Sequence, residues 1–181
     1  MTSAVVNEES KNPAGSRLDV LFVITHLHAG GAERVTVLLA NELASRGLKV
    51  AIATYVKQGD FIDQISAMVT LIEVGGAGWA AAIVPLARLI RRTRPAAVVG
   101  VMVSSNVAAV AAGKLAMTGA RIVLIEHNQV DRGAAHYGSL SYRAIRWSYP
   151  WAHAIVCVSD VSLTATASLS WSLVRTALAL A

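Results

Sequence analysis

Short apolar runs alternate along the chain with longer segments in which apolar residues recur every three or four positions. The run VLFVIT, residues 20–25, is continuous and rich in β-branched side chains, as in a strand covered on both faces. The next segment, 32–46, has helical spacing, and Gly47 follows where a helix often ends. The whole pattern predicts strands at residues 20–25, 49–56, 69–74, 96–103, 121–126 and 153–159, and helices at residues 32–46, 79–92, 106–117 and 140–149.

Strands that alternate with helices are typical of an α/β fold with a doubly wound parallel sheet, Rossmann-like in architecture, because parallel neighbours need crossover connections. Ligands of such sheets bind beyond the carboxyl ends of the strands. Polar side chains follow several of the expected strands, and together with glycine backbone they suit a polyhydroxylated or phosphorylated ligand. The candidates for lining this cleft are His26, His28, Ser104, Ser105, Asn106 and Asn128.

The composition fits one core-forming domain. The 181 residues are 55% hydrophobic, with a mean hydropathy of +0.53, and residues 17–160 are long enough for a single domain. The apolar stretch 96–117 is interrupted by serines and an asparagine at 104–106, so we expect a strand, a turn and a helix rather than a membrane span. Residues 1–16 lack the apolar core of a signal peptide and are expected to form a flexible leader. Cys157 is the sole cysteine, which excludes an internal disulfide and favours the reducing cytoplasm.

Charge is unevenly distributed between the two halves of the sequence. Residues 1–80 hold 6 Lys and Arg against 8 Asp and Glu, and residues 81–181 hold 10 against 3, so the halves carry −2 and +7. This asymmetry favours an anionic partner for the second half, and a merely solvated basic face is the alternative. Nucleic acid is not an expected partner, because the sequence has no recognised nucleic-acid motif and no dense basic stripe.

Gly30 and Gly31 stand between the first expected strand and the first expected helix. The N-terminus of a helix at that place attracts phosphate or carboxylate, and glycine lets a ligand approach the backbone closely. The alternative is a turn that requires unusual backbone angles. Ala32 and Val35 occupy positions where a dinucleotide fingerprint would need glycine, so NAD is not expected.

Three histidines follow expected strands. His26 and His28 are two residues apart and would share a face of an extended strand, as pairs of metal ligands do. A metal site on this pair is an alternative to two ordinary cleft histidines. His127 follows the strand 121–126 and could contact a substrate hydroxyl or share developing charge, with Glu126 either orienting it or facing solvent.

The expected helix at 140–149 combines arginines with aromatic residues. Basic side chains beside tryptophan suit a membrane interface, and packing beneath the sheet is the alternative. The residues proposed for a peripheral membrane contact are Arg143, Arg146, Trp147 and Trp151.

Four stretches of the sequence carry a resemblance to a known family. The first, VLFVITHLHAGGAERVTVLLANELASRGLKVAIAT, contains a Gly-Gly-Ala-Glu-Arg turn between a strand and a long helix, and the later ones are LARLIRRTRPAAVVGVMVSSN, IVLIEHN and YPWAHAIVCVSD. In this order they resemble successive segments of the N-terminal domain of family-four glycosyltransferases with the GT-B fold, and the resemblance covers about residues 17–160.

Membership of this family would imply a retaining, metal-independent transfer of a sugar from a nucleotide-sugar donor to a glycan or lipid-linked acceptor. No cofactor or metal would be needed, and a D-x-D motif is absent from the sequence. By the resemblance, Gly30 and Gly31 would lie against the donor diphosphate, and His127 would act at the reaction centre. The protein would work in the cytoplasm or peripherally at the inner face of the membrane.

The sequence departs from the family pattern after about Asp160. The family continues into a donor domain marked by two glutamates separated by seven residues, a spacing that no pair here has. Residues 161–181 form an atypical apolar tail with one charge, Arg175. We therefore expect a truncated or frame-shifted chain, or a fragment whose donor half is elsewhere, with little or no activity alone. A non-catalytic Rossmann-like binding module and a small metallohydrolase using His26 and His28 are the other hypotheses.

Overall fold

The computed structural model describes residues 17–127 and 139–158. The expectations for the leader 1–16, for Asn128 and for the tail 161–181 lie outside these residues. Six strands form one sheet: β1 (Val20–Ile24), β2 (Val50–Thr54), β3 (Val69–Glu73), β4 (Ala97–Val101), β5 (Arg121–Glu126) and β6 (Ala154–Cys157). The helices are α1 (Gly31–Ser45), α2 (Trp79–Thr93), α3 (Val103–Ala116) and α5 (Ser139–Ser148), with 3₁₀ turns η1 (Ile62–Gln64) and η3 (Tyr149–Trp151).

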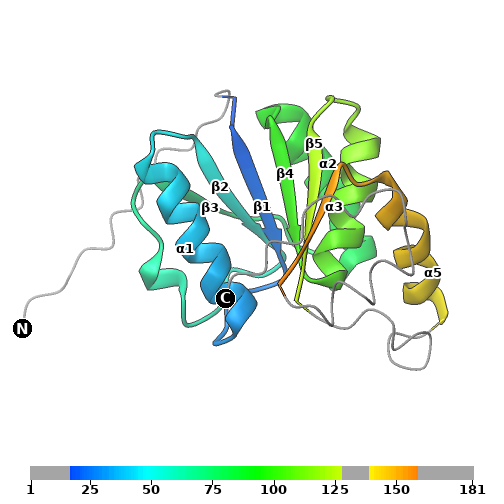
Figure 1. Ribbon diagram of the computed structural model, residues 1–181, viewed down its shortest axis with the longest axis horizontal. Coiled ribbons are helices and arrows are strands. Elements are labelled where there is room, and N and C mark those ends of the chain that lie inside the picture. Colours follow the sequence, from blue (N-terminus) through cyan, green and yellow to red (C-terminus); the bar gives the residue numbers. More distant parts are fainter. Residues whose placement is uncertain (1–16, 128–138, 159–181) are drawn as a thin grey trace, which may run out of the picture.

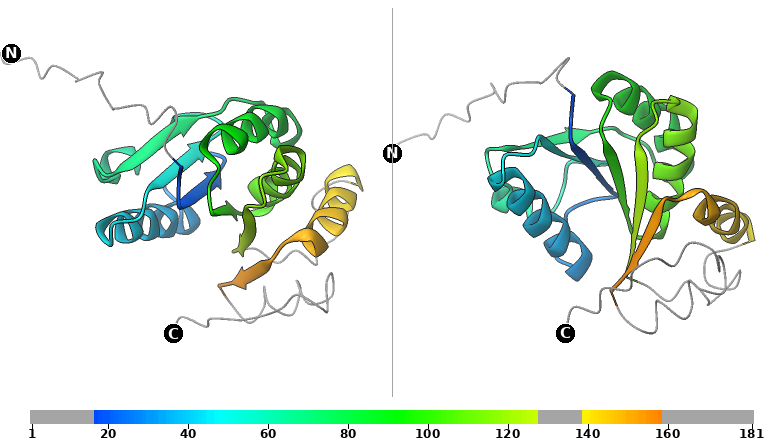
Figure 2. Two further views of the ribbon diagram at one scale, coloured as in Figure 1. Left: turned by 90° about the horizontal axis from the view of Figure 1, so that it is seen from above. Right: turned by 45° about the horizontal axis from the view of Figure 1, so that its top comes forward.

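All six strands pair in parallel in the order β3-β2-β1-β4-β5-β6. Helix α1 lies on one face of the sheet, and α2 and α3 lie on the other (Figures 1 and 2). This arrangement confirms the predicted doubly wound, Rossmann-like parallel sheet. The chain order reverses direction at β1, so the carboxyl end of this central strand lies at the switch point where such folds bind ligands.

Alternation along β1 divides the core into two layers. Leu21 and Val23 face α2 and α3, whereas Phe22 and Ile24 face α1. Helix α5 lies beside α3 (Figure 1) and contributes Ile145 to the first layer. None of the helices in the described residues combines the length and the apolar character needed to cross a membrane.

The ends of the predicted helices and strands match the structure to within two residues except at one junction. The strand predicted to reach residue 103 ends at Val101, and α3 begins at Val103 rather than at residue 106. Met102 takes a left-handed φ of 69°, and its N–H donates to the carbonyl of Ile125. Met102 and Val103 are apolar like the strand before them, so the hydrophobic pattern alone does not indicate that the helix begins at Val103.

Candidate functional site

The glycine turn joins β1 to α1 at the carboxyl edge of the sheet. Gly30 is the N-cap of α1 and has an extended backbone, with φ −160°. Neither Gly30 nor Gly31 has the positive φ that favours glycine. The interpretation as a turn of unusual angles is therefore wrong, and the space left by the missing side chains is the property that distinguishes these positions. A Cβ at Gly31 would meet no atom within 4 Å, so the first turn of α1 is open to an approaching group.

The carboxylate of Glu33 occupies the space beside Gly30. A Cβ on Gly30 would lie 2.2 Å from Glu33 Oε2, and the Glu33 residue is only 7% exposed. Its Oε1 lies 3.6 Å from Nδ1 of His26. An acidic side chain in the first turn of a helix is stabilised by the partial positive charge of that helix end. The sequence analysis did not single out Glu33, although its place three residues after Gly30 was a usable signal for such a contact.

The segment after β2 supports the glycine turn. Leu27 N–H donates to the carbonyl of Gln58 at 2.9 Å, and Phe61 N–H donates to the carbonyl of Leu27 at 3.1 Å. Ala29 N–H donates to Asp60 Oδ2 at 2.8 Å. These bonds fix the backbone that leads into Gly30 by pairing it with a neighbouring loop.

His26 and His28 lie side by side, with ring centroids 4.8 Å apart. His28 Nδ1 lies 4.0 Å from Asp60 Oδ2, and the His28 side chain is 54% exposed. Within residues 17–127 and 139–158, no group of three or more histidine, cysteine and acidic side chains is placed to hold a metal ion. The arrangement therefore offers the metallohydrolase hypothesis no third ligand from the described part of the chain.

The serines after β4 lie in the first turn of α3, beside β1. Ser105 Oγ is 3.4 Å from Thr25 Oγ1, and Ser105 is fully buried. The Tyr55 hydroxyl donates to the carbonyl of Ser104 at 3.2 Å. Burial raises the pKa of Tyr55, an effect that its contacts with Ser104 and Ser105 reduce. Ser104 is half-buried, whereas Ser105 is buried in the packing.

Asn106 was expected to line the cleft, but the structure buries it completely. Its Nδ2 donates to the Ile125 carbonyl at 3.3 Å and to Glu126 Oε2 at 3.2 Å, and it lies 3.2 Å from the Tyr149 hydroxyl. The Tyr149 hydroxyl also donates to Glu126. Gly100 permits this approach, because a Cβ there would lie 2.7 Å from Asn106 Oδ1. Asn106 thus joins α3 to β5 inside the protein.

Glu126 neither orients His127 nor faces solvent, the two expectations from the sequence. It is fully buried in the cluster with Asn106 and Tyr149. Consecutive residues of a strand point to opposite faces of the sheet, so His127, the residue after Glu126, is expected on the face opposite to Glu126.

His127 is half-buried immediately after β5, and its Nε2 is buried without a hydrogen-bond partner among the described residues. Burial lowers the pKa of His127, and the charge of Glu33 acts in the opposite direction. The carboxylate of Glu33 is thus near enough for its charge to act on the imidazole of His127. The structure thus brings His127, Glu33, His26 and Gly30 to one edge of the sheet. Asn128 lies outside the described residues.

The residues proposed for membrane contact lie on α5 and η3. Trp147 and Trp151 are 53% and 50% exposed, and Arg143 and Arg146 are exposed. Lys114 Nζ lies 3.9 Å from the centroid of the Trp151 ring. A hollow of about 600 Å³ opens between α2, α3 and α5, lined by Trp79, Ile83, Val107, Ala111, Arg143, Ala144 and Trp147. Of the aromatic residues in this segment, Tyr149 packs inside the protein, whereas both tryptophans face outward.

Similar solved structures include HepE of Anabaena and the galactosyltransferase WaaB. HepE of Anabaena, solved in complex with UDP and glucose, has a TM-score of 0.68 at 15% identity over 88% of this chain and 44% of its own. Its complex with UDP-glucose gives a TM-score of 0.69 at 13% identity. The lipopolysaccharide outer core galactosyltransferase WaaB in its apo form gives 0.66 at 13% identity, with coverage of 88% of this chain and 45% of its own. At these identities the likeness shows the fold, and the chain spans less than half the length of each structure.

The comparison with curated proteins gave no match. The comparison with protein-family models identifies the family. The family model described as Glycosyltransferase Family 4 matches residues 29–169, from the glycine turn through all the later strands, which is more than half of the sequence. The chain therefore belongs to glycosyltransferase family 4.

Proposed function

We propose that this chain is the acceptor-side half of a glycosyltransferase that moves a sugar from a nucleotide-sugar donor to a glycan or glycolipid acceptor. The observation that carries the proposal is the meeting of the open glycine turn and the unpartnered Nε2 of His127 at one edge of a family-four domain. The complexes of HepE with UDP and glucose and with UDP-glucose support a nucleotide-sugar donor. WaaB, a lipopolysaccharide galactosyltransferase, supports a glycan or glycolipid acceptor.

In this proposal the donor diphosphate lies against Gly30 and Gly31. The backbone N–H groups of the first turn of α1 would stabilise the negative charge that develops when the bond between the sugar C1 and the diphosphate breaks. The acceptor oxygen forms the new bond to C1 with retention of configuration, and its proton leaves to the departing phosphate. Because burial lowers its pKa, His127 is neutral near pH 7 and can offer Nε2 to a sugar hydroxyl. No metal or cofactor is assigned a role.

The acceptor is proposed to be membrane-associated, with α5 facing the bilayer at the inner face of the membrane. The support is the exposed pair Trp147 and Trp151 beside Arg143 and Arg146. Tryptophan favours the boundary between headgroups and acyl chains, and arginine favours anionic headgroups. His26, His28 and Ser104 are proposed to line the acceptor side of the cleft.

Transfer is proposed to require a donor-binding domain in addition to residues 17–158. We expect the 181-residue chain alone to turn over no nucleotide sugar, and turnover by this chain would overturn that statement. Addition of a donor-binding domain of this family, marked by two glutamates separated by seven residues, should permit turnover. If it does not, the binding-module hypothesis is favoured.

The chain joined to that donor domain should transfer sugar to a lipid-linked or glycan acceptor. His127→Ala should reduce kcat by about 100-fold or more, the usual contribution of a positioned acid–base or charge-sharing group. His28→Ala is the comparison variant and should raise KM while changing kcat by less than about fivefold, because His28 is proposed to line the acceptor side and not to act at the reaction centre. Acceptor binding with no turnover of any nucleotide sugar would identify a binding module and refute the proposal.

A further inference from the structure

The opposite edge of the sheet, where the strands begin, has a pocket of its own. Three segments meet there: the residues before β1, the loop from α2 to β4 and the loop from α3 to β5. Backbone hydrogen bonds join them, with Ala96 N–H donating to the Leu18 carbonyl and Arg121 N–H donating to the Ala96 carbonyl. The hollow between them has a volume of about 430 Å³ and is lined by Arg17, Arg94, Pro95, Ala96, Thr118, Gly119, Ala120 and Arg121.

The charge around this pocket is positive and not neutralised by ion pairs. Arg17, Arg94 and Arg121 come from three different segments, and no acidic residue lines the hollow with them. The ion pairs within residues 17–127 and 139–158 are His26–Glu33, His28–Asp60 and Arg46–Glu42, none of which includes these arginines. Asp19, the acidic residue next to β1, accepts a hydrogen bond from the backbone N–H of Lys49. Three arginines thus line one hollow, and none of them forms an ion pair within the part of the chain that the structure describes.

Two further features of the lining are energetically unfavourable in themselves. Thr118 Oγ1 is buried and has no hydrogen-bond partner among the described residues, a state that is rare in native proteins. Arg94 ends α2 with a left-handed φ of 42°, a conformation that glycine would adopt at lower cost. Arginine at this position adds a cation to the lining of the pocket, although its backbone conformation costs more free energy than that of glycine would.

We propose that this pocket binds a phosphate group, carried either by a soluble phosphate compound or by an anionic lipid headgroup. Arginine presents a planar fork of N–H donors that matches phosphate oxygens, and a threonine hydroxyl adds a neutral donor. The site is separate from the glycine turn, because it lies at the other edge of the sheet. It also accounts for part of the positive charge of the second half of the sequence, since Arg94 and Arg121 both belong to that half.

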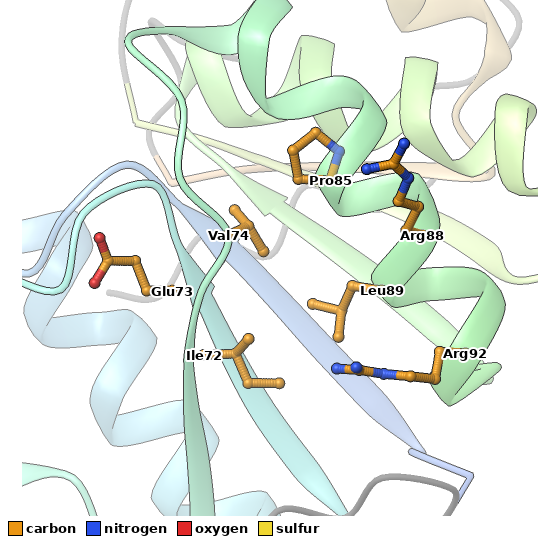
Figure 3. Close-up of a pocket in the computed structure, with 7 residues that line it drawn as sticks. All are labelled: Ile72, Glu73, Val74, Pro85, Arg88, Leu89 and Arg92. Carbon is orange, nitrogen blue, oxygen red and sulfur yellow. The ribbon is translucent and has the colours of Figure 1, made fainter.

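A second pair of arginines provides a matched control. Arg88 and Arg92 extend from α2 over a hollow of about 290 Å³ whose floor is made by Ile72, Val74 and Leu89 (Figure 3). Unlike the proposed site, this hollow has an apolar floor and is lined by no hydroxyl group. Neutralising Arg88 and Arg92 removes the same charge as neutralising Arg94 and Arg121, so any difference between the two double variants reports the site rather than the net charge.

The soluble arm of the test uses inorganic pyrophosphate and the full 181-residue chain. Titration is followed by NMR through the backbone amides of Thr118, Gly119 and Arg121 at low ionic strength. The unchanged chain should show saturable shifts, and Arg94→Gln with Arg121→Gln should weaken binding by roughly tenfold or more, since two charge-assisted contacts are lost. Arg88→Gln with Arg92→Gln should weaken it by less than about twofold. Far-ultraviolet circular dichroism checks that all variants fold.

The lipid arm uses sedimentation with phosphatidylcholine vesicles that do or do not contain phosphatidylglycerol. Retention on the anionic vesicles that is lost only in the Arg94 and Arg121 double variant identifies a headgroup as the source, and saturation by pyrophosphate identifies a soluble one. Either result supports the site. Equal loss of binding in both double variants, or no binding in either arm, would overturn it. Shifts at Gly30 and Gly31 belong to the proposed diphosphate site and are scored separately.

Discussion

At the residue scale, Glu33 changes the description of the candidate site. The sequence directed attention to the glycines and histidines, and the structure adds a buried carboxylate that touches Gly30 and lies 3.6 Å from His26. The same carboxylate acts on His127, where its charge opposes the effect of burial on the pKa. Glu33 therefore contributes to the electrostatic environment of His127 and fills the space beside Gly30.

His127 should titrate below the ordinary histidine pKa of about 6.5, because burial disfavours the charged form more than Glu33 favours it. The folded chain then binds this proton more weakly than the unfolded chain, so His127 lowers stability as pH falls through about 6.5. Glu33→Gln removes the favourable charge and should lower the pKa of His127 further. NMR titration of the imidazole protons measures both values.

The control for this titration is Asp60→Asn, which removes a carboxylate near His28 but not one that acts on His127. It should leave the His127 titration unchanged. A pKa of His127 that stays the same or rises in Glu33→Gln would contradict the coupling between the two residues.

At the element scale, the turn after β1 depends on the loop after β2. Gly59 has a φ of 137°, and a Cβ there would lie 1.9 Å from the carbonyl carbon of Leu27. That contact is with backbone, which cannot move aside as a flexible side chain can. The loop and the glycine turn therefore form one structural unit, although about thirty residues separate them in the sequence.

Gly59→Ala should destabilise the chain by about 2 kcal/mol or more, because it combines an unfavourable φ with a backbone collision. Gly47→Ala is the matched control, since Gly47 has a φ of 87° but open space around it. It should cost about 1 kcal/mol, the penalty for the backbone conformation alone. Urea unfolding followed by circular dichroism measures both, and equal losses would show that the loop yields to the added methyl group.

The sequence predicted the elements well because each is governed by its own periodicity. The strand–helix alternation also located His26, Ser104 and His127 at one edge, since all parallel strands point the same way. Which side chains open to that edge depends on packing between distant segments. Asn106 is buried because Gly100 leaves space for its side chain, and Glu126 is buried because Tyr149 and Asn106 donate hydrogen bonds to it. These contacts join distant segments, so a local sequence pattern does not predict them.

At the scale of the whole molecule, a buried polar cluster of Asn106, Glu126 and Tyr149 joins three elements, α3, β5 and η3. Tyr149, in η3, donates to Glu126 of β5, and Asn106 of α3 donates to the same carboxylate. Burial of such a group is tolerated only when its hydrogen bonds are made. The cluster thus anchors η3, which follows α5 directly, to β5 and α3.

Tyr149→Phe should lower the free energy of unfolding by about 1 to 3 kcal/mol, because it withdraws a donor from a buried carboxylate. Tyr55→Phe is the control: it removes a hydroxyl that donates to the neutral carbonyl of Ser104, and it should cost about 0.5 to 1.5 kcal/mol. Urea unfolding of both variants gives the comparison. A smaller loss for Tyr149→Phe than for Tyr55→Phe would mean that the remaining donors satisfy Glu126.

The carboxylate beside Gly30 has a calorimetric consequence under the proposed function. A diphosphate seated against that glycine must share space with Glu33, so binding either displaces the carboxylate or protonates it. Protonation would make ligand binding take up a proton from the buffer, and the measured heat would then change with the ionisation enthalpy of the buffer. Displacement would give the same heat in Pipes and in Tris. Isothermal titration in the two buffers therefore reveals whether this domain responds to its ligand by a movement or by a change of charge.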